Sequence, residues 1–173
     1  MFTEDSIVTI ARETVEEYVK KGTIKEINDN ELSPELKKQA GVFVTLKKES
    51  NLRGCIGTVQ PTQPNIAREI VKNAVNAAAH DPRFPAVRED ELEYLSYSVD
   101  VLGQKEKVED KTDLDPQKYG VVVKKGTRTG LLLPDLEGVD TIEKQLEIAR
   151  KKAGIKETGN FEIYRFPVIR YKE

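Results

Sequence analysis

Short β-rich runs that come in pairs constrain the fold of this chain most. Residues 42–46 and 52–60 flank the polar segment 47–51, and residues 119–123 and 130–133 flank a cationic segment around a glycine. Two β-rich runs joined by a short polar segment are typical of an antiparallel hairpin. The sequence therefore predicts two hairpins and, with them, a largely antiparallel sheet.

Three amphipathic stretches lie before, between and after these hairpins. Apolar residues at helical spacing predict one helix over residues 4–21, with Thr3 as its N-cap, and a second from Pro64 to about Ala79. A third helix is expected between Thr141, a capping residue, and Gly154, a residue that commonly ends helices.

Two further β-rich segments complete the pattern. Residues 95–101 alternate between apolar and polar, which predicts a half-buried strand. Residues 161–171 are also β-rich, and Pro167 among them predicts an edge strand or a bulge because proline donates no ladder hydrogen bond. The charged segment 105–118 is expected to be an exposed loop. Hairpins interleaved with helices predict a single α+β domain over residues 1–173.

Charge and cysteine content exclude several classes of protein. The net charge of −2 is unlike that of general nucleic-acid or membrane-surface binders, which are clearly basic. One cysteine excludes an internal disulfide and a cysteine-rich metal site, and it favours a reducing compartment. The longest aliphatic run, 131–133, is far shorter than the ~20 residues that span a bilayer. We therefore expect a soluble, cytoplasmic protein with no membrane segment.

The segment 52–58, with the sequence LRGCIGT, is the strongest candidate for a functional site. In a strand, Arg53, Cys55 and Gly57 share one face, so a permanent cation stands beside the only thiol. A nearby cation favours the reactive thiolate, and Gly54 and Gly57 indicate a bulge or a close backbone approach, as in the floor of a small ligand pocket. Alternatively, Cys55 is a small buried hydrophobe and Arg53 pairs with a surface carboxylate.

The segment 80–84 is the second candidate. His80 is the only imidazole and is a potential base for Cys55 if the helix end packs over the hairpin. The alternative is a histidine that interacts favourably with the dipole at a helix C-terminus. Arg83 is a potential anion ligand, and an Asp81–Arg83 pair that fixes the turn is an equal alternative.

Three cations at the second hairpin, Lys124, Lys125 and Arg128, are the third candidate. Such a cluster can contact the phosphates of RNA, although no aromatic stacking platform accompanies it and charged hairpin tips are usually only solvated. The sequence contains no phosphate-binding loop, no dinucleotide-binding glycine pattern, no nucleophile-elbow serine and no paired histidine ligands. It therefore nominates no metal and no cofactor.

The run LRGCIG at 52–57 is specific enough to compare with known families. It is followed, in order, by DPRFP at 81–85, YG at 119–120, GLLLP at 130–134 and KAG at 152–154. In these motifs the chain resembles the AMMECR family, and the resemblance covers essentially its whole length. The resemblance implies a two-lobed α+β fold and a protein whose biochemical function is undetermined.

The resemblance also implies partners. Family members in prokaryotes are often encoded beside, or fused to, Memo-like proteins, which share a fold with non-haem-iron dioxygenases, and beside radical-SAM proteins. One hypothesis is therefore an enzyme or accessory subunit in the same pathway. In it Cys55 is the nucleophile or redox thiol, Arg53 is its activator or an anion clamp, His80 and Arg83 are supporting groups, and Gly54 and Gly57 shape the pocket. The other is a non-catalytic module that binds a protein partner or RNA.

Overall fold

A computed structural model describes residues 4–156 and 159–173. The chain forms two compact units. The first contains the residues up to Leu102 together with the C-terminal segment Ile169–Glu173, and the second is Gly103–Val168. Strand β7 (Glu162–Lys172) contributes residues to both units.

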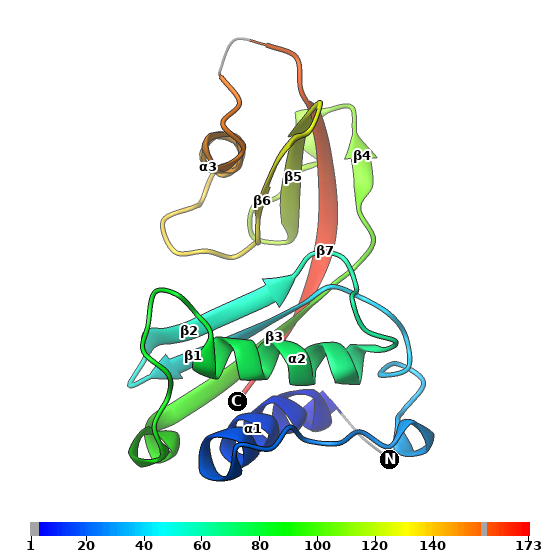
Figure 1. Ribbon diagram of the computed structural model, residues 1–173. Helices are drawn as coiled ribbons and strands as arrows, with labels where there is room; N and C mark the ends of the chain where they lie inside the picture. Colours follow the sequence, from blue (N-terminus) through cyan, green and yellow to red (C-terminus); the bar gives the residue numbers. More distant parts are fainter. Residues whose placement is uncertain (1–3, 157–158) are drawn as a thin grey trace. The chain divides into compact units, whose positions relative to one another are not determined.

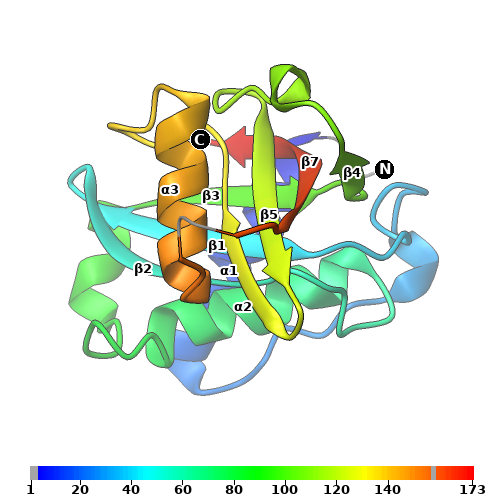
Figure 2. The same cartoon turned by 90° about the horizontal axis from the view of Figure 1, so that it is seen from above.

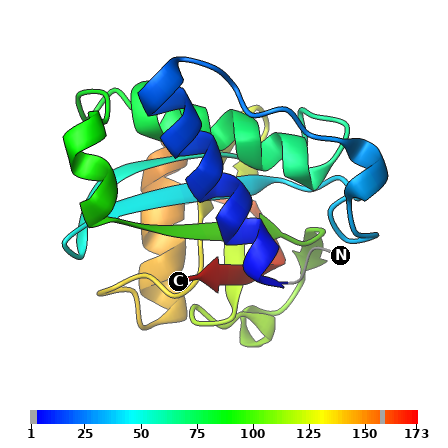
Figure 3. The same cartoon turned by 90° about the horizontal axis from the view of Figure 1, so that it is seen from below.

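The first unit is a sheet with two helices on one face. Strands β2, β1 and β3 pair in that order, all antiparallel, and β2 is the edge strand. The helices α1 and α2 lie on the same face and cross each other (Figures 1 and 3). The elements are α1 (Glu4–Lys21), β1 (Val42–Lys48), β2 (Asn51–Thr58), α2 (Ile66–Ala79) and β3 (Leu95–Leu102), with 3₁₀ turns at Asp29–Glu31 and Glu89–Tyr94.

The core of this unit fills the space between the sheet and the helices. It includes Val42, Val44 and Leu46 from β1, which alternate with the less buried Phe43 and Thr45. The same alternation leaves Phe43 and Thr45 on the face that α1 and α2 do not cover. The candidate residues of β2 likewise point to the helix-covered or to the uncovered face of this sheet.

The second unit is a smaller sheet packed on one helix. Strand β5 (Tyr119–Lys125) pairs with both β6 (Arg128–Leu132) and β7, and β4 (Glu106–Val108) pairs with β7. Helix α3 (Ile142–Ala153) runs along β5 and β6 (Figure 2). A 3₁₀ turn at Lys111–Asp113 follows β4.

The helix ends are set by capping residues. The Asn65 side chain accepts a hydrogen bond from the Arg68 amide at the start of α2, and Thr141 does the same for the Lys144 amide at the start of α3. Gly154 ends α3 in the left-handed conformation, at φ 67°. The caps predicted at Thr141 and Gly154 are confirmed, whereas the predicted cap Thr3 lies outside the described residues.

Both predicted hairpins are present, but with shorter connections. Strands β1 and β2 extend to Lys48 and from Asn51, so that only Glu49 and Ser50 form the turn. Both turn residues have positive φ, 49° and 68°, as a two-residue hairpin turn with the sheet's twist requires. The prediction that all of residues 47–51 form the connection was wrong, because polar residues can continue a strand when their side chains point to solvent.

Two expectations for the second unit were wrong. The segment 105–118 is not only a loop, since β4 and a 3₁₀ turn lie within it. Strand β7 is not an edge strand, because β4 and β5 pair with its two sides, and its register with β5 runs up to Pro167 without a bulge. Pro167 is tolerated because it lies opposite Tyr119, the first residue of β5, and beyond Arg165, the last residue that pairs with β4.

Candidate functional site

The two family motifs of the first unit meet at the free edge of β2. The Cys55 amide donates to Asp81 Oδ2 at 3.0 Å, and Arg83 Nη2 donates to the Cys55 carbonyl oxygen at 3.2 Å. An edge strand otherwise presents unpaired backbone groups that can recruit another strand. The loop after α2 therefore covers the edge of β2 at Cys55 with side-chain groups of both charges.

Asp81 and Arg83 form the ion pair that the sequence suggested as an alternative to anion binding. Arg83 Nε and Nη2 donate to the two Asp81 oxygens at 3.0 and 2.8 Å, and the Arg83 amide also donates to Asp81. The Arg83 guanidinium holds the pKa of the buried Asp81 carboxyl well below its usual range. Arg83 itself remains 55% exposed, with its guanidinium 5.5 Å from the Phe84 ring centre.

Arg53 is the extra residue of a β-bulge. Leu46 pairs with Gly54 and Lys47 pairs with Leu52, so Arg53 has no partner on β1. Its side chain is almost fully buried and reaches Glu91, to which it donates two hydrogen bonds of 3.0 and 2.9 Å. It also donates to the carbonyl oxygens of Pro85 and Ala86. The guanidinium thereby ties β2 to the segment that precedes β3.

Glu91 is the residue of this cluster that the sequence did not nominate. It lies in the charged run 88–93, where nothing marks one carboxylate as buried. Besides Arg53 it accepts hydrogen bonds from Lys48 Nζ and the Arg88 amide. The Arg53 guanidinium is the largest cause that lowers the pKa of Glu91 to about 2. A carboxylate with these partners is ionised throughout the neutral range.

The thiol of Cys55 lies on the face of the sheet that α1 and α2 leave uncovered. Its sulfur is 3.2 Å from Thr45 Oγ1, directly across the strand pair, and Thr45 is in turn opposite Ser98 of β3. Burial raises the pKa of the Cys55 thiol, although the Thr45 hydrogen bond and the Arg83 charge oppose this effect. The depressed pKa that a thiolate nucleophile requires is therefore not what this environment produces.

At each of the two glycines of the motif a neighbouring group packs very close to β2, and the two groups lie on opposite sides of the strand. A Cβ on Gly54 would lie 2.2 Å from the Ala77 carbonyl oxygen, so only glycine lets β2 and α2 pack at this distance. A Cβ on Gly57 would lie 2.2 Å from the ring of Phe43, its cross-strand partner. Both glycines thus serve packing within the unit, and Gly54 marks a helix contact where a ligand pocket was expected.

His80 is the C-cap of α2, and its side chain is exposed. It lines a groove together with Tyr18 and Asn76. Within the described part of the chain no hydrogen bond joins its imidazole to Cys55. Its place at a helix C-terminus corresponds to the alternative that the sequence left open.

The third candidate cluster belongs to the second unit. Lys124, Lys125 and Arg128 are exposed on the β5–β6 hairpin of the second unit, and Arg128 donates to the Gly154 carbonyl oxygen. In residues 4–156 and 159–173 no group of three His, Cys, Asp or Glu side chains could hold a metal ion. None of the helices in these ranges is long and apolar enough to cross a membrane.

An α+β architecture with the 52–58 and 81–85 motifs joined at a strand edge defines the class of this protein. The family model described as AMMECR1 matches residues 8–171, and the chain belongs to this family. A protein of Thermotoga maritima is 52% identical over 99% of this chain and 100% of its own length. The crystal structure of an uncharacterized protein from Pyrococcus horikoshii has a TM-score of 0.81 and 34% identity, covering 95% of this chain and 88% of that one.

A third relative differs in length. A protein of Clostridium acetobutylicum is 48% identical over 98% of this chain, but the match covers only 36% of that protein. The AMMECR1 region is therefore about a third of a longer polypeptide in that organism.

Proposed function

We propose that this chain is a cytosolic accessory subunit that acts by binding a protein partner through the β2 edge, where Arg83 donates to the Cys55 carbonyl oxygen and its guanidinium lies over the Phe84 ring. The partner classes implied by the family resemblance are Memo-like and radical-SAM proteins. The observation that carries the proposal is that Asp81 and Arg83 cover this edge while Arg83 stays 55% exposed. Arginine and aromatic side chains held rigidly in this way are typical anchors of protein interfaces.

The state of the thiol supports binding over nucleophilic catalysis. Burial raises the pKa of Cys55, its hydrogen-bond partner is the neutral Thr45 hydroxyl, and Arg53 is committed to Glu91. A cysteine nucleophile is activated by a base or by a lowered pKa. The longer Clostridium relative also supports an accessory role, because fusion places such a module permanently beside another segment.

The first test is the reactivity of Cys55, the only thiol of the chain. We expect iodoacetamide to alkylate the native protein more slowly than the urea-unfolded protein at each pH, with a midpoint above the reference thiol pKa of ~8.5. Thr45→Val should raise the midpoint further, because the hydroxyl stabilises the thiolate. Fast native alkylation with a midpoint below the reference value would revive the nucleophile hypothesis.

The second test measures partner binding directly. A Memo-like and a radical-SAM protein from the same organism are titrated with the chain in a calorimeter. Phe84→Ala should weaken binding by about tenfold or more, as interface anchors do. Ile169→Ser, at an exposed apolar residue of β7 in the same unit, is the control and should leave binding unchanged. Failure of both partners to bind, or equal loss in the control, would refute the proposed interface.

A further inference from the structure

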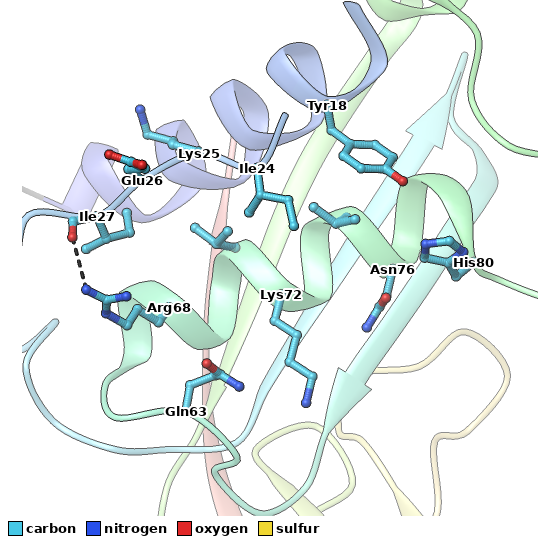
Figure 4. A pocket seen from close by; sticks show the side chains of 12 residues that line it. Tyr18, Ile24, Lys25, Glu26, Ile27, Gln63, Arg68, Lys72, Asn76 and His80 are labelled. Atoms are coloured by element: carbon cyan, nitrogen blue, oxygen red, sulfur yellow. Dashed lines mark hydrogen bonds between the residues drawn. The ribbon is translucent and has the colours of Figure 1, made fainter. Parts of the chain in front are cut away.

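A groove on the helix side of the first unit is independent of the Cys55 region. Its walls are the segment after α1 and the outer surface of α2, and its volume is about 780 Å³. Ile24 points from the first wall toward α2, as Figure 4 shows, and it is 59% exposed. Val71 and Val75 of α2 and the ring of Tyr18 add apolar surface. The groove thus offers an apolar body a place to bind.

One row of polar side chains follows the other wall. Lys72 and Asn76 are four residues apart on α2 and therefore share one side of the helix, and His80, the C-cap, follows at its end. All three line the groove together with Gln63 (Figure 4). A few polar groups beside an apolar wall are what a small-molecule site uses to fix the orientation of its ligand.

Three cationic side chains and one carboxylate line the groove. The cations are Lys25, Arg68 and Lys72, and the carboxylate is Glu26. Lys25 is paired with Glu13, and Arg68 with Asp29. Among the described residues these pairs leave one cation, Lys72, and one carboxylate, Glu26, and Figure 4 shows Glu26 well away from Lys72. Lys72 is therefore the cation available to a ligand.

Lys72 has no carboxylate partner among the residues that the structure describes. Its ammonium donates to the Thr62 hydroxyl at 2.8 Å, and this hydroxyl in turn donates to Glu69 Oε1 at 2.8 Å. In the same described ranges the His80 imidazole has no hydrogen-bond partner. These two groups therefore keep their capacity to interact with a bound anion.

We infer that this groove binds a small organic anion with an apolar or aromatic body, its acidic group against Lys72 and its body against Ile24 and Tyr18. The volume lies within the range of roughly 300–1,000 Å³ that is usual for small-molecule sites. The alternative occupant is a protein segment, which would also cover the exposed side chain of Ile24. The single available ammonium, that of Lys72, favours a small molecule, because one anionic group is enough to match it. The inference concerns a separate surface and does not depend on the proposed function.

The probe for the test is 8-anilinonaphthalene-1-sulfonate, an aromatic anion whose fluorescence rises on transfer out of water. We expect saturable binding of one molecule per chain, weakened by salt because exposed charges are screened. Lys72→Glu should weaken binding by about tenfold or more, and Ile24→Ser by a smaller factor. Lys47→Glu, an exposed lysine of β1 outside the groove, is the charge-matched control and should leave binding within about twofold.

A neutral analogue separates the anion from its apolar body. N-phenyl-1-naphthylamine has the same rings without the sulfonate, and it should bind at least about tenfold more weakly to the native chain. Equal binding of the two probes would overturn the inference, and so would an unchanged affinity in Lys72→Glu. Thermal denaturation of each variant shows whether the fold is retained. If Lys72→Glu were unfolded, Lys72→Gln, which removes only the charge, would be expected to give the same loss of binding.

Discussion

Arg53→Ala is expected to destabilise the protein by about 3–5 kcal/mol, because it leaves a buried carboxylate without its main partner. Glu91 would retain Lys48 and the Arg88 amide, but the two hydrogen bonds from the guanidinium would be lost. The carbonyl oxygens of Pro85 and Ala86 would lose their donor as well. Urea denaturation followed by circular dichroism measures the loss.

The control for Arg53→Ala is a second arginine of the same region. Arg88 forms an ion pair with Asp90 in which the two side chains are 73% and 67% exposed. Exposed pairs of this kind contribute about 0–1 kcal/mol, so Arg88→Ala should cost little. Arg53→Lys keeps the charge but loses the paired hydrogen-bond geometry, so its loss of stability should lie between those of Arg53→Ala and Arg88→Ala. A loss in Arg53→Ala no larger than in Arg88→Ala would show that the cluster does not hold β2 in place.

The same pair predicts a pH dependence. The folded-state pKa of Glu91 is about 2, below the ordinary value of 4.5 that it has in the unfolded chain. Its contribution to stability is therefore complete above about pH 4.5 and is lost as the pH falls toward 2. Glu91→Gln should be less stable than the native protein at neutral pH, and its stability should fall less between pH 5 and 2. If the free energy of unfolding changed equally with pH in the two proteins, Glu91 would not be the group that causes this pH dependence.

Gly54→Ala is expected to cost about 3 kcal/mol, at the upper end of what overpacking by one methyl group causes. The added Cβ would meet the Ala77 carbonyl oxygen at 2.2 Å, and this oxygen belongs to the main chain of α2. No rotamer change can relieve such a contact, so β2 or α2 must move. Denaturation midpoints of the native protein and the variant measure the cost.

Gly57→Ala provides the comparison, since its obstacle is a side chain. The added Cβ would meet the Phe43 ring, and shortening that side chain removes the obstacle. We expect Phe43→Ala to recover much of the stability lost in Gly57→Ala, whereas no substitution of Ala77 should rescue Gly54→Ala. A stability for Gly54→Ala within about 1 kcal/mol of the native protein would show that α2 can shift freely at this point.

The sequence by itself determined the local elements of this protein. Helical spacing and capping residues at Thr141 and Gly154 located α3, and paired β-rich runs located both hairpins, because each of these signals acts over a few neighbouring residues. The family motifs at 52–57 and 81–85 were also visible in the sequence alone. The Asp81–Arg83 pair could be anticipated because its members are two positions apart.

The tertiary structure alone decided which distant groups meet. Arg53 and Glu91 are 38 positions apart, and no local rule selects one carboxylate from a charged run as the buried partner. The β-bulge that frees Arg53 from its β1 partner follows from the register with β1, and the raised pKa of Cys55 follows from its burial. Charge pairing and desolvation depend on distances in space, which the order of residues along the chain does not contain.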